Sequence, residues 1–167
     1  RADIVLNNLV GHAVLTGDVR VLSDGTPWRP LVHAEDIARA FLTCLSAPRE
    51  AINCRAFNIG TEDNNLTVAE IAAAVVDAVP GSELLITGES GADPRSYRVD
   101  FTRARDELGY SAQWSIPDGA TQLYRAYTDY GLTSDGFFHD FTRLPRLEQL
   151  RQSGALDETM RRISARA

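Results

Sequence analysis

The stretch GTPWRPLVHAEDIARAF, residues 25–41, holds a turn, a short strand and the start of a helix. RPLVH, residues 29–33, is typical of a short strand. Glu35 and Asp36 follow it and predict the first turn of a helix, because the N-terminal end of a helix dipole favours acidic side chains. Arg29 therefore stands where the chain enters a strand. Its guanidinium is placed either for a bound anion or for an ion pair with Glu35 or Asp36.

Helix and strand signals alternate along the chain as far as Tyr130. Thr67 and Glu70 have the spacing of a capping box, in which each side chain bonds the other residue's backbone N–H. Ser115 is placed to cap a later helix. The alternation favours an α/β fold with a mostly parallel sheet over an all-α or all-β fold. Helices are predicted over 3–15, 34–45, 68–79, 102–108, 117–130, 144–150 and 157–163, and strands over 19–22, 29–33, 55–60 and 83–87.

The composition excludes several classes of function. A net charge of −6 and a pI near 5.0 disfavour binding to nucleic acid or to an anionic membrane. No apolar run approaches the roughly 20 residues that span a bilayer, and no leader sequence is recognisable, so we expect a cytoplasmic protein. Cys44 and Cys54 are expected to be free thiols, and neither they nor the histidines have metal-ligand spacing. Patterns for a nucleophilic serine or a glycine-rich dinucleotide turn are absent.

Anion-binding groups are the remaining candidates for chemistry. The planar fork of arginine suits phosphate oxygens, and each charge-assisted hydrogen bond contributes about 1.5–3 kcal/mol. Any one of these side chains alone is better explained by a structural role, so a site requires that they converge. The candidates are Arg29, Arg95 and Arg98, an amide from Asn7 or Asn8, and the phenol of Tyr97.

The order of these motifs resembles the C-terminal, substrate-binding half of the extended short-chain dehydrogenases/reductases, the NAD-dependent epimerase/dehydratase family that acts on nucleotide sugars. The resemblance implies a partial Rossmann-type α/β fold, with short parallel or mixed strands and helices, whose N-terminal dinucleotide-binding part is absent. Residues 1–127 would form the nucleotide-sugar-binding portion, and residues 128–167 a helical, aromatic-rich tail. The motifs that carry it are NNL (7–9), VRVLSDG (19–25), PWRPLVHAEDIARAF (27–41), FNIG (57–60) and DPRSYRVDFTRARDELGY (93–110).

The same resemblance implies roles for particular residues around a nucleoside diphosphate. Asn8 and Leu9 would meet the diphosphate end, with the Asn8 amide donating a hydrogen bond. Leu22 would lie at the edge of the nucleobase. Arg29 would grip the phosphates, and Tyr97 would close the pocket from a distant loop.

Other positions follow the family less closely. Asp93 matches the acid of the family's loop, and Arg95 is close enough to replace the arginine that is common there. His33 and Asp36 would be framework residues, with Asp36 capping the following helix and tethering neighbouring loops. Pro30 replaces the usual aspartate after the arginine, which removes a carboxylate and a backbone donor from the strand.

The hydride chemistry of the family is missing from this chain. In the family a tyrosine of a Y-x-x-x-K motif is the general acid/base, and its lysine lowers the tyrosine pKa. All 17 basic residues here are arginines, so that pair cannot occur. NAD or NADP would belong to the parent enzyme, and this chain alone is expected neither to bind it tightly nor to turn over a sugar nucleotide. The start at Arg1 suggests a truncation, a proteolytic fragment or a split-gene product.

Two alternatives remain open beside the substrate-binding part of an epimerase or dehydratase. One is a non-enzymatic, stand-alone binding or interaction module on the same scaffold. The other is a small α/β domain whose arginines serve stability alone. In each case the chain should expose an apolar face or an open strand edge that the missing Rossmann half would cover. We therefore expect that half, or self-association into a homo-oligomer, as a partner beside the nucleoside-diphosphate sugar.

Overall fold

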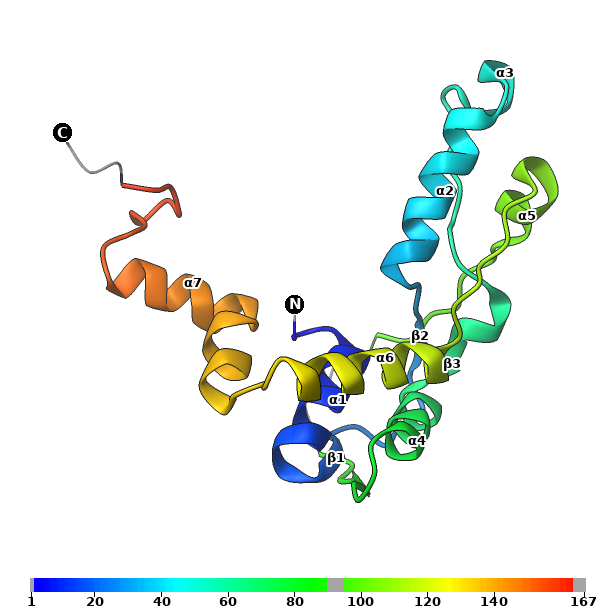
Figure 1. Cartoon of the computed structure of the whole chain (residues 1–167). Helices are drawn as coiled ribbons and strands as arrows, with labels where there is room; N and C mark the ends of the chain where they lie inside the picture. Colours follow the sequence, from blue (N-terminus) through cyan, green and yellow to red (C-terminus); the bar gives the residue numbers. More distant parts are fainter. Residues whose placement is uncertain (1, 90–94, 164–167) are drawn as a thin grey trace.

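The computed structural model describes residues 2–89 and 95–163, in a body from which two arms extend (Figure 1). The helices and strands, in chain order, are α1 (Val5–Thr16), β1 (Asp18–Val21), β2 (Trp28–Pro30), α2 (Ala34–Ser46), α3 (Arg49–Ile52), η1 (Glu62–Asn64), β3 (Asn65–Thr67), α4 (Val68–Ala78), β4 (Glu83–Ile86), α5 (Thr102–Leu108), α6 (Ile116–Asp129), η2 (Gly136–Asp140) and α7 (Arg143–Gln152).

The body consists of three helices, α1, α4 and α6, packed together with the parallel pair β1 and β4. Parallel pairing aligns Val19 with Leu84 and Val21 with Ile86. The two valines point into the core, whereas all four β4 residues are exposed. An apolar core of this kind supplies the main favourable term in folding. Its fully or nearly buried members are Leu6, Leu9, Val10, Ala13, Val19, Val21, Ile71, Ala72, Val75, Val79, Ile116 and Ala120.

Local signals in the sequence set the helix starts of the body. Thr67 and Glu70 form the predicted capping box at α4, with the Thr67 Oγ1 accepting from the Glu70 N–H at 3.2 Å. Ser115 caps α6 and forms a second capping box with Asp118. Gly17 ends α1 at φ 79°, a backbone conformation that costs glycine little. The predicted α/β class is confirmed.

The sheet is not mostly parallel. β2 pairs antiparallel with β3, with Arg29 opposite Leu66, and this pair is separate from β1 and β4. The strands on either side of the Gly25 turn therefore belong to different sheets. Gly25 has φ 82°, and a Cβ there would lie 2.9 Å from the Cβ of Ala69, so the turn packs directly onto α4.

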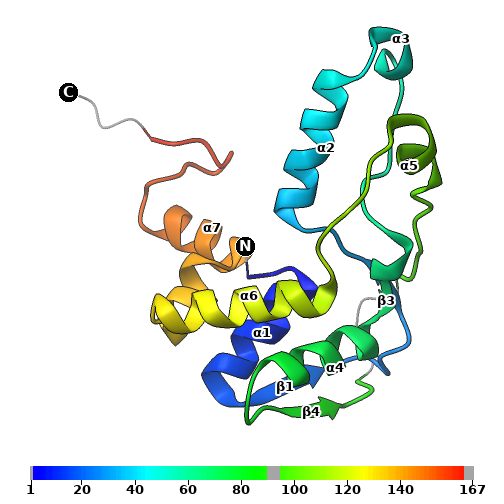
Figure 2. The same ribbon diagram turned by 45° about the vertical axis from the view of Figure 1, so that its right-hand side comes forward.

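The first arm contains α2, α3 and α5, and it projects from the body in both views (Figures 1 and 2). A small second core holds it together, formed by Ala40, Ala104 and Tyr110 with Phe57 and Ile59 against them. Residues 55–60, predicted as a strand, form no strand in the structure. The reason is that a strand needs a neighbour, and no described residue hydrogen-bonds the backbone of residues 57–59.

The second arm is the C-terminal segment, which leads away from the body through η2 and α7 (Figure 2). Phe137 of η2 is completely buried, whereas α7 buries no residue. The helix predicted over 157–163 is wrong. Asp157 Oδ1 accepts the backbone N–H groups of Thr159 and Arg161, and this local bonding forms a turn in place of a helix.

Candidate functional site

Arg29 lies in the middle of β2, where the antiparallel pair with β3 fixes its backbone. Its guanidinium donates to the Trp28 carbonyl oxygen at 2.9 Å and to the Arg95 carbonyl oxygen. The two acidic side chains in the first turn of α2 pair with a different arginine. Arg39 lies 3.0 Å from Asp36 and 3.7 Å from Glu35. Arg29 therefore fastens the loop at residue 95 to β2.

The loop from residue 95 to 99 lies along β2 through several further contacts. The Trp28 N–H donates to Ser96 Oγ at 3.0 Å, and the Tyr97 N–H donates to the Trp28 carbonyl at 3.4 Å. The Arg98 guanidinium sits over the Trp28 ring, 4.6 Å from its centroid, in a cation–π contact. The structure thus brings Arg29, Arg95 and Tyr97 to one place, and Tyr97 is 54% exposed.

Asn65 holds the far end of the same loop and was missed by the sequence reasoning. It is 5% exposed, and its amide both donates to the Val99 carbonyl and accepts the Val99 N–H, each at 2.9 Å. Its neighbour Asn64 donates to the Trp114 carbonyl at 2.9 Å. Two consecutive amides before a capping box were the available signal, because buried amides are retained where they hydrogen-bond backbone.

The remaining predicted site residues do not lie on β2 or on the loop from residue 95 to 99. Asn8 is half-buried on α1, and β1 separates that helix from β2 in the chain. Leu9 is 5% exposed and belongs to the core, so its side chain presents almost no surface to a ligand. Leu22 is exposed, and its carbonyl accepts the Glu89 N–H at 2.6 Å. Asp93 lies outside the described residues.

A salt bridge next to Leu22 adds charge at this edge. Arg20 donates to Glu89 at 2.7 Å, and this hydrogen bond, with one from Thr87, holds the pKa of Glu89 below its ordinary value. Both side chains are about half exposed, so the pair contributes little stability.

His33 and Asp36 are framework residues, and His33, not Asp36, is the residue that caps α2. His33 caps α2, with Nδ1 accepting the Glu35 N–H at 3.1 Å, and its ring stacks on Trp114 at 4.0 Å. Asp36 was expected to cap this helix, and that is wrong. It is buried, and its carboxylate accepts the backbone N–H groups of Gln113 at 2.9 Å and Trp114 at 3.0 Å. The predicted tethering of a neighbouring loop is confirmed.

A cavity of about 580 Å³ lies beside this framework. Asn7 lines it from α1, so it opens one residue away from Asn8. His33 and Gln122 close one side through a 2.7 Å hydrogen bond between Nε2 and Oε1. The lining is mainly apolar, formed by Ile4, Leu6, Leu31, Val32, Ile37, Ile116 and Leu123 among others.

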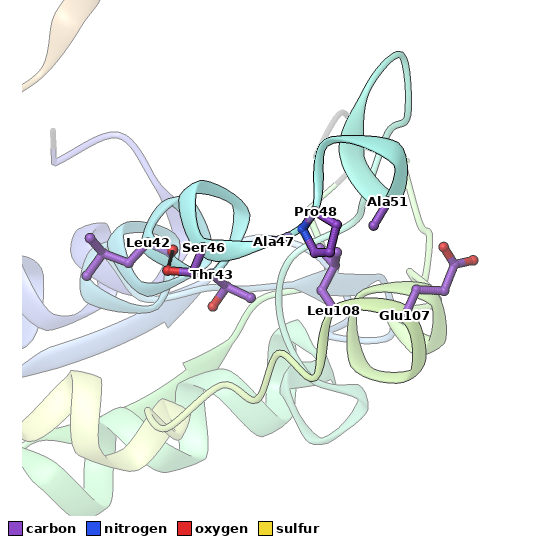
Figure 3. Close-up of a pocket in the computed structure, with 8 residues that line it drawn as sticks. All are labelled: Leu42, Thr43, Ser46, Ala47, Pro48, Ala51, Glu107 and Leu108. Atoms are coloured by element: carbon purple, nitrogen blue, oxygen red, sulfur yellow. Dashed lines mark hydrogen bonds between the residues drawn. The ribbon is translucent and has the colours of Figure 1, made fainter.

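A second hollow, of about 570 Å³, lies at the outer end of the first arm (Figure 3). Figure 3 shows Leu42 and Thr43 of α2 on one side and Glu107 and Leu108 of α5 on the other. Glu107 is the charged group that lines it. Glu107 is already paired with Arg55 and Arg103, so the lining offers no arginine fork to a phosphate and is a poor match for the predicted ligand.

The described residues contain no group of three histidine, cysteine or acidic side chains placed to hold a metal ion. Within the same ranges, no helix combines the length and apolar character needed to cross a bilayer.

Comparison with known proteins gives a consistent match. Residues 2–60 match the model of the NAD dependent epimerase/dehydratase family. The chain is 30% identical over 122 residues to the UDP-glucose 4-epimerase of Schizosaccharomyces pombe, which covers 71% of this chain and 34% of that enzyme. It is also 30% identical over 112 residues to the dTDP-glucose 4,6-dehydratase of an Actinoplanes species, covering 66% and 34% of the two chains.

Solved structures have the same fold. The UDP-glucuronic acid 4-epimerase from Bacillus cereus, in complex with UDP-glucuronic acid and NAD, superposes with a TM-score of 0.61 at 18% identity. That match covers 78% of this chain and 41% of the enzyme. MoeE5, in complex with UDP-glucuronic acid and NAD, superposes with a TM-score of 0.55 at 27% identity, covering 79% and 43%.

The chain therefore has the α/β fold of these enzymes over the part that it shares with them. Residues 2–60 carry the match to the NAD dependent epimerase/dehydratase family, and the two relatives named above are a UDP-glucose 4-epimerase and a dTDP-glucose 4,6-dehydratase. The chain spans about a third of the length of the S. pombe and Actinoplanes enzymes.

Proposed function

We propose that this chain is the part of an NAD(P)-dependent nucleotide-sugar epimerase or dehydratase that binds the nucleoside diphosphate. Arg29 supplies the fork for the phosphates, and Tyr97 and Arg95 supply a phenol and a second cation from the loop beside it. Asn8 supplies an amide from α1. Residues 1–127 form this portion, and residues 128–167 form a separate tail. The observation that carries the proposal is the attachment of the loop from residue 95 to 99 to β2 through Arg29.

Rigid attachment matters because a preorganised site loses less freedom when the ligand binds. Asn65 and Ser96 hold the loop at two points, and Arg98 stacks on Trp28 between them. A diphosphate could then accept from guanidinium groups whose backbone is already fixed. Arginine is the side chain best suited to this, since it presents two parallel N–H groups to two oxygens.

The dinucleotide does not fit the residues of this chain. A pyrophosphate needs a glycine-rich turn at a helix start, and the sequence contains no such pattern. It also contains no lysine that could lower the pKa of a catalytic tyrosine. We therefore propose that NAD or NADP, and the hydride chemistry it supplies when bound, belong to a part of the enzyme that this chain does not include.

Replacement of Arg29 by lysine tests the phosphate site. Lysine keeps the charge but loses the fork, so we expect the dissociation constant for UDP or dTDP to rise about tenfold. Titration calorimetry measures this, with Arg49→Lys at the outer end of the first arm as the matched control, because Arg49 is exposed and distant from β2. Equal affinity of the wild type and Arg29→Lys would remove Arg29 from the site.

The unpaired segment at residues 56–59 indicates the kind of partner that the first arm accepts. Burial alternates along it, with Phe57 and Ile59 packed on the arm and Ala56 and Asn58 exposed. This is the pattern of a strand, and its backbone groups at 57–59 have no partner among the described residues. We propose that the sheet of the missing dinucleotide-binding half adds to this segment, and that a second copy covers the same face when the chain is alone.

An exposed apolar ridge on α2 accompanies the unpaired segment. Phe41 is 69% exposed and Leu45 is 82% exposed, one helical turn apart. A ridge of this kind favours self-association, because burying it removes apolar surface from water.

Light scattering tests whether the ridge of Phe41 and Leu45 causes self-association. We expect the wild type to run above its monomer mass of 18.3 kDa at high concentration, and a Phe41→Glu/Leu45→Glu variant to run as a monomer. Ser46→Glu is the control, since it adds a charge to the same helix at an exposed polar position and should leave the mass unchanged. A monomeric wild type at high concentration would contradict self-association.

A further inference from the structure

The second arm is joined to the body at one buried side chain. Phe137 of η2 is 0% exposed, and its ring lies against the backbone of α1 at Gly11. A Cβ at Gly11 would lie 2.0 Å from Phe137 Cε2 and 2.4 Å from Cζ, so only glycine leaves room for the ring. Beyond η2, α7 buries nothing. The position of the arm therefore depends on this one insertion and a few hydrogen bonds.

Those hydrogen bonds are few and peripheral. The Ala2 N–H donates to the Phe141 carbonyl at 2.8 Å, and the Leu132 N–H donates to the Tyr127 carbonyl at 2.8 Å. Gly131, at φ 64°, gives the chain its turn after α6. Such a connection can open locally without unfolding the body, because it carries little of the total buried surface.

His12 follows Gly11 on α1 and touches the inserted ring directly. Its imidazole lies edge-on to Phe137, with ring centroids 5.5 Å apart, and to Phe138, at 5.3 Å. The two phenylalanine rings also pack on each other at 5.1 Å. An uncharged imidazole packs well in such a cluster, whereas burial there takes part of the hydration from an imidazolium.

We propose that His12, Gly11 and Phe137 form a proton-sensitive latch that holds the C-terminal arm on α1 and releases it when His12 is protonated. This proposal does not rest on the nucleotide site.

The charged and titratable groups around the latch do not offset this effect. From η2, His139 lies 3.9 Å from Asp135, and Asp140 pairs with Arg146 at 3.0 Å. From α6, the Tyr127 ring lies 6.4 Å from the Phe137 ring, and burial raises the pKa of Tyr127, so it stays neutral. Asp3 lies on the segment that bonds Phe141, and α1 has no other titratable side chain.

The direction of the pH dependence follows from burial. Burial lowers the pKa of His12 below 6.5 in the closed latch, whereas the opened arm leaves His12 with its ordinary value. The closed latch has its full stability above pH 6.5 and loses it as the pH falls through the lowered pKa. Between pH 7.5 and 5.5 the opening equilibrium can rise by up to about tenfold, the limit set by one group with an open-state pKa near 6.5.

Hydrogen exchange on the full chain tests the latch. Amides of residues 136–142 should exchange more readily at pH 5.5 than at pH 7.5, after correction for the intrinsic rates. His12→Phe keeps a ring in the cluster and should remove the pH response, whereas His139→Gln, in the same segment but paired with Asp135, should retain it. Equal protection at both pH values in the wild type, or a full response in His12→Phe, would overturn the proposal.

A titration of the wild type keeps the test independent of how the variants fold. The His12 imidazole resonances, followed by NMR, should titrate below pH 6.5, and the Phe137 ring resonances should shift with the same midpoint. A His12 midpoint at or above 6.5, or Phe137 resonances that do not follow it, would likewise contradict the latch.

Discussion

Replacement of Asp36 by asparagine is expected to lower the free energy of unfolding by about 3–5 kcal/mol. The carboxylate is fully buried and accepts three hydrogen bonds, from Arg39 at 3.0 Å and from the N–H groups of Gln113 at 2.9 Å and Trp114 at 3.0 Å. An asparagine side chain has one acceptor oxygen, so its NH₂ group must face a donor. At least one buried backbone N–H then loses its partner.

Urea unfolding followed by far-ultraviolet circular dichroism measures this loss. Glu35→Gln is the matched control. Glu35 also lies near Arg39, at 3.7 Å, but its side chain is 54% exposed, so we expect a change below about 1 kcal/mol. Similar midpoints for Asp36→Asn and the wild type would show that the carboxylate does not hold the arm together.

Replacement of Gly11 by alanine is expected to expel Phe137 and cost about 3–5 kcal/mol, similar to Phe137→Ala. The cause is steric, since the added Cβ would lie 2.0 Å from the ring. The two changes should not be additive, because both remove the same contact. In a Phe137→Ala background the clash is gone, and Gly11→Ala should then stabilise the chain by up to about 1 kcal/mol, since alanine is the better helix former.

Gly11→Ala is thus expected to destabilise the wild type and to stabilise the Phe137→Ala variant. This reversal would show that the destabilisation comes from the Phe137 ring and not from crowding around α1 in general. Thermal or urea unfolding of the two single variants and the double variant completes the cycle. Gly119→Ala is the control on α6, where the nearest atom to an added Cβ is Leu6 Cδ2 at 3.6 Å, an ordinary contact. If Gly11→Ala were destabilising by the same amount in both backgrounds, the account of the Phe137 insertion would be wrong.

Signals local in sequence predicted the helices well. The capping boxes of Thr67 with Glu70 and of Ser115 with Asp118 depend on residues three positions apart, so the sequence alone contains them. Burial alternates along residues 56–59 as it does in a strand. No strand forms there, because strand pairing depends on a second strand elsewhere in the chain. The helix at 157–163 failed because the side chain of Asp157 bonds the backbone that a helix would use.

In the candidate site, too, contacts between residues distant in sequence were harder to predict than local features. The resemblance predicted that Arg29 and the loop bearing Arg95 and Tyr97 meet, and the structure brings these residues together. Asn65, which clamps that loop, was missed because its partner Val99 is distant in sequence. The burial of Leu9 was readable from the helical apolar spacing, but the resemblance assigned Leu9 to the diphosphate end of the ligand.

The measurement that tests the central proposal most directly is an NMR titration of the full chain with UDP and with dTDP. The account predicts saturable shifts at residues 28–29, 96–98 and Asn8, and none at residues 42–51 around the hollow of Figure 3. Shifts confined to residues 42–51, or no saturable shifts with either nucleotide, would contradict it.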